Sequence, residues 1–197
     1  MTGYPNIYSR GDTPIPDRPM VGLLCSRKCP GRLILDTYDL VGLFRRLGVT
    51  VISGFHSAME EECLRILLRS PYPVVWCLAR GLFKRIPAKR AYCRLAIAER
   101  RLLVISPFKP EVAQANTRTA MVRNRVIADL ATAVLVPHAE PGCKVEALTF
   151  ELLAEGKPVY TFDHPANAAI LARGAKDISE FELAPFAAAL ADGGQTA

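Results

Sequence analysis

The chain has 197 residues, 50% of them hydrophobic and 22% charged, with a formal net charge of +6. This composition is ordinary for a globular protein with one main domain, and charged residues interrupt every hydrophobic run, which excludes a membrane-spanning helix of ~20 apolar residues. The six cysteines have neither the dense spacing of a secreted disulfide scaffold nor that of a zinc finger, so we expect a soluble cytoplasmic protein that needs no membrane, metal or cofactor.

Short aliphatic runs alternate along the chain with stretches of helical period, the pattern of a parallel sheet with crossover helices. Strands are predicted at Val21–Cys25, Thr50–Ser53, Val74–Leu78, Leu102–Ser106, Ala133–Pro137 and Pro158–Phe162. Helices are predicted at Leu33–Leu47, Ala58–Arg69, Ala88–Arg100, Arg118–Thr132 and Lys144–Glu155. The fold class is therefore α/β, with a mostly parallel sheet of about six strands and helices on both faces.

The same pattern divides the chain into three segments. Residues 1–19 are expected to form an N-terminal arm, because they carry four prolines and no apolar signal-peptide core. Residues 20–175 are expected to form the α/β domain. Residues 176–197 are expected to form an Ala-rich C-terminal helix or tail.

Ligands of an open α/β sheet bind beyond the carboxyl ends of its strands, so the loops there are the places to look. The first loop combines a hydroxyl, two cations and free backbone N–H groups in Ser26, Arg27 and Lys28, which suits a phosphate. After the second strand, Gly54 next to Ser53 either lets a ligand approach the backbone or only permits a tight turn. His56 has no carboxylate or thiol partner in view, so we predict no catalytic role for it.

Two arginines flank an asparagine in the fourth predicted helix. Arg123 and Arg125 lie beside its apolar stripe with Asn124 between them, an arrangement that suits a phosphate and sugar clamp. Charge is also concentrated in this part of the chain: residues 80–125 hold twelve Lys and Arg against two acids, whereas ten acids face four bases from residue 126 onward. Such an excess indicates either a polyanion-binding surface or a solvated helix face.

These motifs together resemble a known family. Ser26-Arg27, Ser53-Gly54, Leu103–Pro107 and Arg123–Leu130 are similar, in the same order, to the Gly-Ser-Arg, Ser-Gly, Ser-Glu-x-Pro and Arg-Asn-Arg-x-Ile-x-x-Leu elements of the DNA-processing protein A (DprA/Smf) family. The resemblance implies a Rossmann-like three-layer sandwich that binds single-stranded DNA, forms a homodimer and delivers the DNA to a recombinase in natural transformation or recombination. Cys25 departs from the family pattern, which has glycine there.

The resemblance also implies a set of site residues. Ser26 and Arg27 match the phosphate-contacting segment, Arg123 and Asn124 match the clamp, and the loop near Gly142 is similar to a later turn of the family. The predicted phosphate and DNA site comprises Ser26, Arg27, Lys28, Ser53, Gly54, Arg123, Asn124, Arg125, Gly142 and Lys144. Phe83 and Phe108, in or beside the basic segment, are candidates for base stacking.

Two other interpretations stay open. The sheet topology is shared with the LOG family of nucleotide 5′-monophosphate phosphoribohydrolases, and Met121 and the Pro141–Glu146 segment are similar in outline to that family's motifs. Glu146 would then be the candidate catalytic acid or base beside a ribose. The third interpretation is a sensor that binds a phosphorylated nucleotide without turning it over.

Overall fold

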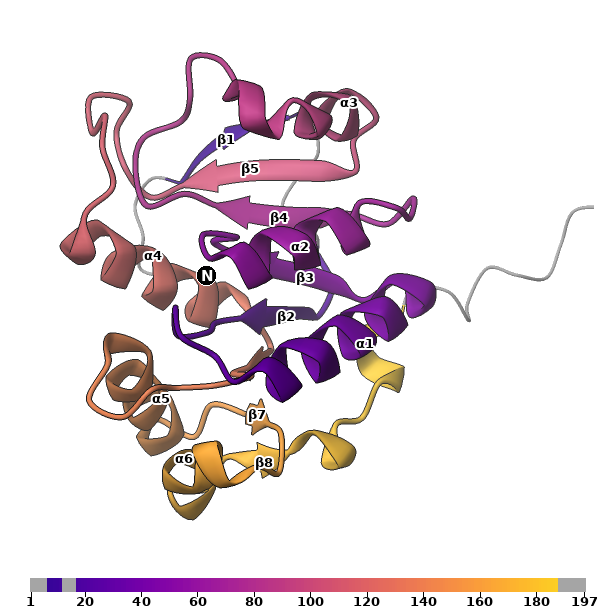
Figure 1. Ribbon diagram of the computed structural model, residues 1–197. Helices are drawn as coiled ribbons and strands as arrows, with labels where there is room; N and C mark the ends of the chain where they lie inside the picture. The colour runs from indigo at the N-terminus through magenta and orange to yellow at the C-terminus, as the bar shows by residue number, and fades with distance from the viewer. Residues whose placement is uncertain (1–6, 12–16, 188–197) are drawn as a thin grey trace, which may run out of the picture.

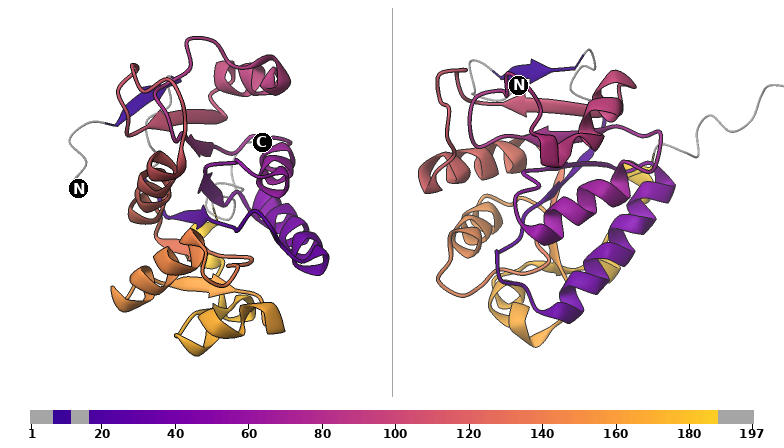
Figure 2. Two further views of the ribbon diagram at one scale, coloured as in Figure 1. Left: turned by 60° about the vertical axis from the view of Figure 1, so that its left-hand side comes forward. Right: turned by 45° about the horizontal axis from the view of Figure 1, so that its top comes forward.

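A computed structural model describes residues 7–11 and 17–187 as an eight-stranded sheet covered by helices on both faces (Figures 1 and 2). The strands are β1 (Tyr8–Arg10), β2 (Met20–Leu23), β3 (Thr50–Ser53), β4 (Val74–Cys77), β5 (Leu102–Ser106), β6 (Ala133–Leu135), β7 (Val159–Thr161) and β8 (Lys176–Asp177). The α-helices are α1 (Gly31–Leu47), α2 (Ala58–Leu67), α3 (Tyr92–Ala98), α4 (Thr117–Leu130), α5 (Lys144–Ala154) and α6 (Ala168–Ala172).

The spatial order of the strands is β1-β5-β4-β3-β2-β6-β7-β8. All neighbours are parallel except β1, which pairs antiparallel with β5. The chain runs outward from β2 to β5 and then returns to place β6 on the other side of β2. Loops that follow β2 and β6 therefore diverge, and this reversal of strand order is where an open α/β sheet opens a crevice for a ligand.

Two hydrophobic cores sandwich the sheet. On one face α1, α2 and α3 pack through residues such as Phe44, Leu64 and Cys93. On the other face α4 and α5 pack through residues such as Ile127 and Leu152, next to α6. Every residue of β2, β3, β4, β5 and β6 is buried, which explains why these strands are nearly continuous in apolar residues. The left view of Figure 2 shows the two helical layers.

The predicted fold class is confirmed, and all six predicted strands are present within two residues of their expected ends. Two further strands, β1 and β8, were not predicted, because short edge strands are not buried on both faces and lack an aliphatic run. The helix predicted at Ala88–Arg100 is a 3-10 turn, Ala88–Arg90, followed by α3. Segment boundaries at residues 19 and 175 stay predictions, and the end of the tail, residues 188–197, lies outside the described residues.

Within the described ranges, no helix is long and apolar enough to cross a membrane.

One buried hydroxyl offers a test of the packing around β3. Thr50 is fully buried, and its Oγ1 finds no hydrogen-bond partner among the described residues. Thr50→Val replaces an unsatisfied hydroxyl with a methyl of similar shape, so we expect stabilisation by about 1 kcal/mol in urea unfolding. Thr161→Val is the matched control, because Thr161 Oγ1 lies 2.7 Å from the Val136 carbonyl oxygen and 2.8 Å from Asn167 Nδ2. Destabilisation of equal size in both variants would contradict this account.

Candidate functional site

A pocket of about 400 Å³ lies at the carboxyl edge of the sheet, beside the reversal between β2 and β6. The loop after β2, the turn after β3, the loop after β6 and the first turns of α2, α4 and α5 surround it. Figure 1 shows the arrowheads of β2, β4 and β5 pointing to the side on which α4 begins. The sheet topology thus brings together five separate parts of the chain, within residues 25–27, 56–60, 79, 115–124 and 140–145.

Arg123 is the central charge of this pocket. Its side chain rises from the buried face of α4, and the residue is only 7% exposed. Nε donates a hydrogen bond to Asn124 Oδ1 at 2.7 Å, but no carboxylate among the described residues forms an ion pair with the guanidinium. Burial lowers the pKa of Arg123, and the charge of Glu60 acts in the opposite direction. A buried cation without an ion-pair partner is costly, so this pocket favours an anionic ligand.

Gly54 makes room for that guanidinium. A β-carbon added at Gly54 would lie 1.4 Å from Arg123 Nη1 and 2.1 Å from its Cζ. No side chain other than hydrogen fits between the backbone and the guanidinium. The glycine in the turn after β3 is therefore explained by close approach of Arg123.

Three helices of at least ten residues begin at the pocket wall: α2, α4 and α5. Their N-terminal residues are capped by Ser57, Asn116 and Cys143 side chains, which accept hydrogen bonds from the backbone of the first turn. The N-terminal ends of helices carry partial positive charge and attract phosphate groups. The N-terminal ends of α2, α4 and α5 therefore add to the positive potential that Arg123 creates in the pocket.

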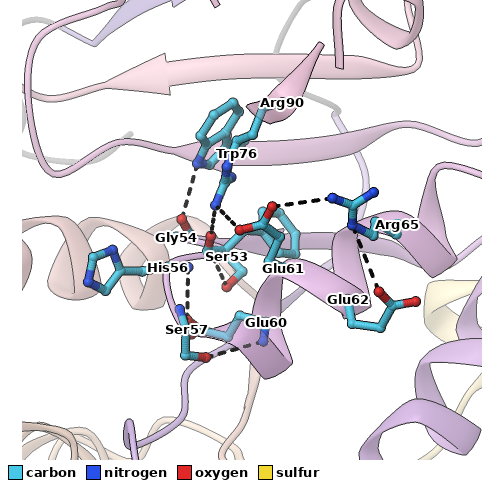
Figure 3. Close-up of polar contacts among 11 residues, drawn as sticks. Ser53, Gly54, His56, Ser57, Glu60, Glu61, Glu62, Arg65, Trp76 and Arg90 are labelled. Atoms are coloured by element: carbon cyan, nitrogen blue, oxygen red, sulfur yellow. Dashed lines mark hydrogen bonds and ion pairs between the residues drawn. The ribbon is translucent and has the colours of Figure 1, made fainter. Parts of the chain in front are cut away.

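Trp76 and Arg90 anchor the turn after β3 (Figure 3). Trp76 Nε1 donates to the Gly54 carbonyl oxygen at 3.1 Å, and Arg90 Nη2 donates to the carbonyl oxygen of Phe55. Arg90 also lies 3.2 Å from a carboxylate oxygen of Glu61 and stacks over the Trp76 ring at 4.4 Å. Phe55 has φ of 44°, a left-handed conformation that a bulky residue adopts only when its surroundings impose it.

The N–H groups of the same turn are also bound. Glu60 Oε2 accepts hydrogen bonds from His56 N at 3.0 Å and from Ser57 N at 2.9 Å, while Ser57 Oγ accepts from Glu60 N. This reciprocal arrangement is a capping box that starts α2. Glu60 thus caps the start of α2, and the residue also lines the pocket.

The hydroxyls of two predicted site residues, Ser26 and Ser53, form hydrogen bonds within the protein. Ser26 Oγ accepts from Glu140 N at 2.8 Å and lies 3.1 Å from Cys143 Sγ, which ties the loop after β2 to the loop after β6. Ser53 Oγ donates to the Leu23 carbonyl oxygen at 2.8 Å, which ties β3 to β2. Both serines shape the pocket by fixing its loops.

Some of the predicted basic residues line the pocket and others do not. Arg27 is exposed on the pocket wall and has no ion-pair partner among the described residues, whereas exposed Lys28 lies 3.6 Å from Glu140. Lys144, the first residue of α5, is exposed and also lines the pocket. Asn124 lines it as well and orients Arg123.

Arg125 and Gly142 lie outside the pocket lining. Arg125 forms a two-pronged ion pair with Glu155, with both N–O distances at 2.7 Å, and a further contact to Asp129. Hydrogen bonding to Glu155 raises the pKa of Arg125. The Gly142 N–H donates to Glu146 Oε2 at 2.6 Å. Arg125 therefore joins α4 to α5, and the carboxylate of Glu146 caps its own helix.

Several pocket residues were missed by sequence reasoning. Asn116, Thr117, His56 and Cys143 all line the pocket. A signal for Asn116 was present, because Asn116 followed by Thr119 forms a second capping box, so α4 begins at Thr117 rather than at Arg118. His56 and Cys143 had no such signal, because their positions depend on contacts between distant segments.

Exposed cations continue from the pocket onto the neighbouring loops. The loops after β4 and β5 are joined by a hydrogen bond from Gly81 N to Val112 O at 2.8 Å and by one from Ser106 Oγ to Arg80 O. Four exposed cations without a described carboxylate partner lie on these loops or at the start of α4: Lys84, Arg85, Lys109 and Arg118.

The two aromatic candidates of this region are half-buried. Phe83 packs against Trp76 with ring centroids 5.6 Å apart, and the Arg80 guanidinium lies 4.9 Å from its ring centre. Phe108 N donates to Ser106 Oγ. Base stacking on either ring stays a prediction.

In the described part of the chain, no group of three or more His, Cys, Asp or Glu side chains is arranged to hold a metal ion.

Comparison with known proteins assigns a family to this fold and site. The model of the DNA recombination-mediator protein A family matches residues 3–182. The chain belongs to the DNA recombination-mediator protein A family. This confirms the resemblance that the motifs around Ser26, Gly54 and Arg123 indicate. A search of curated protein sequences finds no match at the significance required.

Solved structures agree with the family at the level of the fold. DNA processing protein A from Helicobacter pylori, described for its single-stranded DNA binding mode, has 19% identity and a TM-score of 0.73 over 91% of this chain and 84% of its own. DNA processing protein A from Streptococcus pneumoniae has 19% identity and a TM-score of 0.75 over 89% and 66%. The molybdenum cofactor binding protein of Rippkaea orientalis is more distant, with 12% identity and a TM-score of 0.57 over 81% and 88%.

Proposed function

We propose that this chain binds single-stranded DNA through its phosphate backbone, with the pocket around Arg123 as the anchor. The observation that carries the proposal is the buried guanidinium of Arg123, which packs on Gly54 and has no described carboxylate partner. A phosphate group placed there would supply the missing negative charge and face the N-terminal ends of α2, α4 and α5. Membership of the family and the similarity to the H. pylori protein support DNA as the source of that phosphate.

The exposed cations have a different role from the anchor. Arg27, Lys84, Arg85, Lys109 and Arg118 are solvated and add long-range attraction along a strand, an attraction that salt screens. Arg123 is already desolvated, so its contact with phosphate is worth more than that of a surface residue. We therefore expect an affinity that depends steeply on salt and on this single residue.

We infer that the pocket binds its ligand without turning it over. The phosphoribohydrolase interpretation requires Glu146 as an acid or base beside a ribose, but Glu146 accepts from Gly142 N and does not line the pocket. Glu60, which does line it, uses one carboxylate oxygen to hold two backbone N–H groups. Incubation with nucleoside 5′-monophosphates is expected to release no free base.

The family resemblance supports three finer proposals. We propose that the chain forms a homodimer, that it delivers bound DNA to a recombinase, and that it acts in the cytoplasm, where its free thiols stay reduced. Light scattering on the purified protein tests the first of these directly. A recombinase-loading assay on coated single strands tests the second.

The decisive experiment is fluorescence anisotropy with a labelled single-stranded oligonucleotide across about 50 to 300 mM salt, comparing Arg123→Gln with Arg125→Gln. Loss of one charge-assisted contact of about 2 kcal/mol is expected to weaken binding about 30-fold in Arg123→Gln. Arg125→Gln removes an equal charge from the same helix, but its ion pair with Glu155 lies away from the pocket, so we expect a change of no more than about twofold. A flat salt response, or equal loss in both variants, would contradict the proposal.

A further inference from the structure

His56 lies at the pocket with a fixed backbone and a free ring. Its N–H is held by Glu60, and the preceding carbonyl of Phe55 is held by Arg90. In Figure 3 the imidazole points away from the cluster formed by Trp76, Arg90 and Glu61. The residue is exposed, lines the pocket, and its ring nitrogens have no hydrogen-bond partner among the described residues.

Mostly positive charge acts on this ring. It comes from Arg123 on α4, Arg27 in the loop after β2 and, more weakly, Arg90 in the 3-10 turn before α3, while Glu60 on α2 is the acid that acts against them. The pKa of His56 is lowered, and the largest cause is partial desolvation by the pocket walls. The three arginines also lower it, whereas Glu60 raises it. The net effect favours the neutral imidazole over the imidazolium in the free protein.

The far wall of the pocket contributes further ionisable groups. Glu140 and Cys143 come from the loop after β6, and Lys144 begins α5. Glu140 already pairs with Lys28 at 3.6 Å, and Cys143 Sγ accepts from Glu146 N. The free positive charge next to His56 therefore outweighs the free negative charge until an anion arrives.

We infer that His56 is a further DNA-contacting residue, and that its imidazole takes up a proton when a DNA phosphate enters the pocket, so that single-stranded DNA binds more tightly as pH falls. The inference rests on the proposed DNA binding. A phosphate beside Arg123 cancels the field that keeps His56 neutral and offers an acceptor to an imidazolium N–H. The site then gains a second charged contact at pH values below the bound-state pKa of His56.

The direction of the effect follows from proton linkage. The pKa of His56 is lowered in the free protein and is raised by the phosphate in the complex, so binding takes up a proton between the two values. Affinity is therefore highest below the free-state pKa, falls as pH rises through the bound-state pKa, and is constant above it. Because only one proton is taken up, the affinity can change by no more than about tenfold per pH unit.

The test measures anisotropy of a labelled oligo(dT) from about pH 5.5 to 8 at constant ionic strength. Thymine and the phosphodiester do not titrate in this range, so a pH dependence belongs to the protein. We expect about fivefold weaker binding at pH 8 than at pH 5.5, and a flat profile for His56→Gln. His164→Gln is the matched control, because His164 caps a short 3-10 helix next to β7, away from the pocket, and it is expected to keep the wild-type slope.

The outcomes separate this inference from the proposed function. No binding at any pH would overturn the proposed function itself. Binding with the same pH slope in wild type and His56→Gln would overturn the role of His56 alone. An NMR titration of the three histidine rings of the wild-type protein needs no variant to fold: the His56 pKa is expected below 6.5 without oligo(dT) and higher with it, and an unchanged pKa would also refute the inference.

Discussion

Gly54→Ala is expected to reduce affinity for single-stranded DNA at least about 30-fold, as much as removal of the Arg123 guanidinium itself. The added β-carbon would overlap Nη1 and Cζ of Arg123, at 1.4 and 2.1 Å. Trp76 and Glu60 hold the turn in place through its Gly54 carbonyl and its following N–H groups, so the long arginine side chain must move rather than the backbone. The positive charge is then retained in the protein but lost from the anchor position.

Anisotropy with the same oligonucleotide measures this effect. Gly42→Ala is the matched control, because a β-carbon there comes no closer than 3.8 Å to another atom, at Arg46 Nη1, and alanine favours the middle of α1. Circular dichroism is expected to show both variants folded. Undiminished binding by folded Gly54→Ala would show that the position of the Arg123 guanidinium does not determine affinity.

The repetitive parts of this fold follow directly from local sequence. Strands buried on both faces, such as β3 and β5, require continuous aliphatic runs, and both have the predicted boundaries. The edge strand β1, with the residues Tyr8-Ser9-Arg10, has no such requirement and pairs with β5 through its backbone. Only knowledge of its partner would have predicted it.

The location of the candidate site could be predicted from the sequence, but the contacts of its side chains could not. Strand order fixes which loops meet, so residues after β2 and on α4 were correctly expected at one edge of the sheet. Arg123 and Arg125 look alike in sequence, yet they differ by about 200° around a helix. Arg123 consequently faces Gly54, and Arg125 faces Glu155. Which of these two arginines is buried depends on packing from a distant segment. The partners of the Ser26 hydroxyl, Glu140 N and Cys143 Sγ, likewise come from a distant segment.

The turn after β3 links these observations, because it is contacted from both sides. Arg123 packs on its Gly54 from the pocket side, and Arg90 binds the carbonyl of Phe55 from the side of Trp76. The basic segment of the sequence therefore contains two buried arginines with separate roles. Arg123 has no carboxylate partner within the described ranges and is available to a ligand, whereas Arg90 pairs with Glu61 and supports the turn.

Arg90→Met is accordingly expected to destabilise the protein by about 3 kcal/mol in urea unfolding, the lower end of the range for breaking a buried ion pair. The methionine fills much of the same volume, but the carbonyl of Phe55 loses its donor, the carboxylate of Glu61 loses this partner, and the Trp76 ring loses its stacked cation. The lower end applies because the Glu61 side chain is 24% exposed and keeps a contact with Arg65.

Lys89→Met is the matched control, since Lys89 is the preceding residue in the same 3-10 turn and is exposed. It removes an equal charge and adds the same side chain, so a change within about 0.5 kcal/mol is expected. A small effect in both variants would show that the hydrogen bond, ion pair and stacking of Arg90 contribute little to stability. A large effect confined to Arg90→Met would show that this buried pair supports the turn that carries His56 to the pocket and holds Gly54 against Arg123.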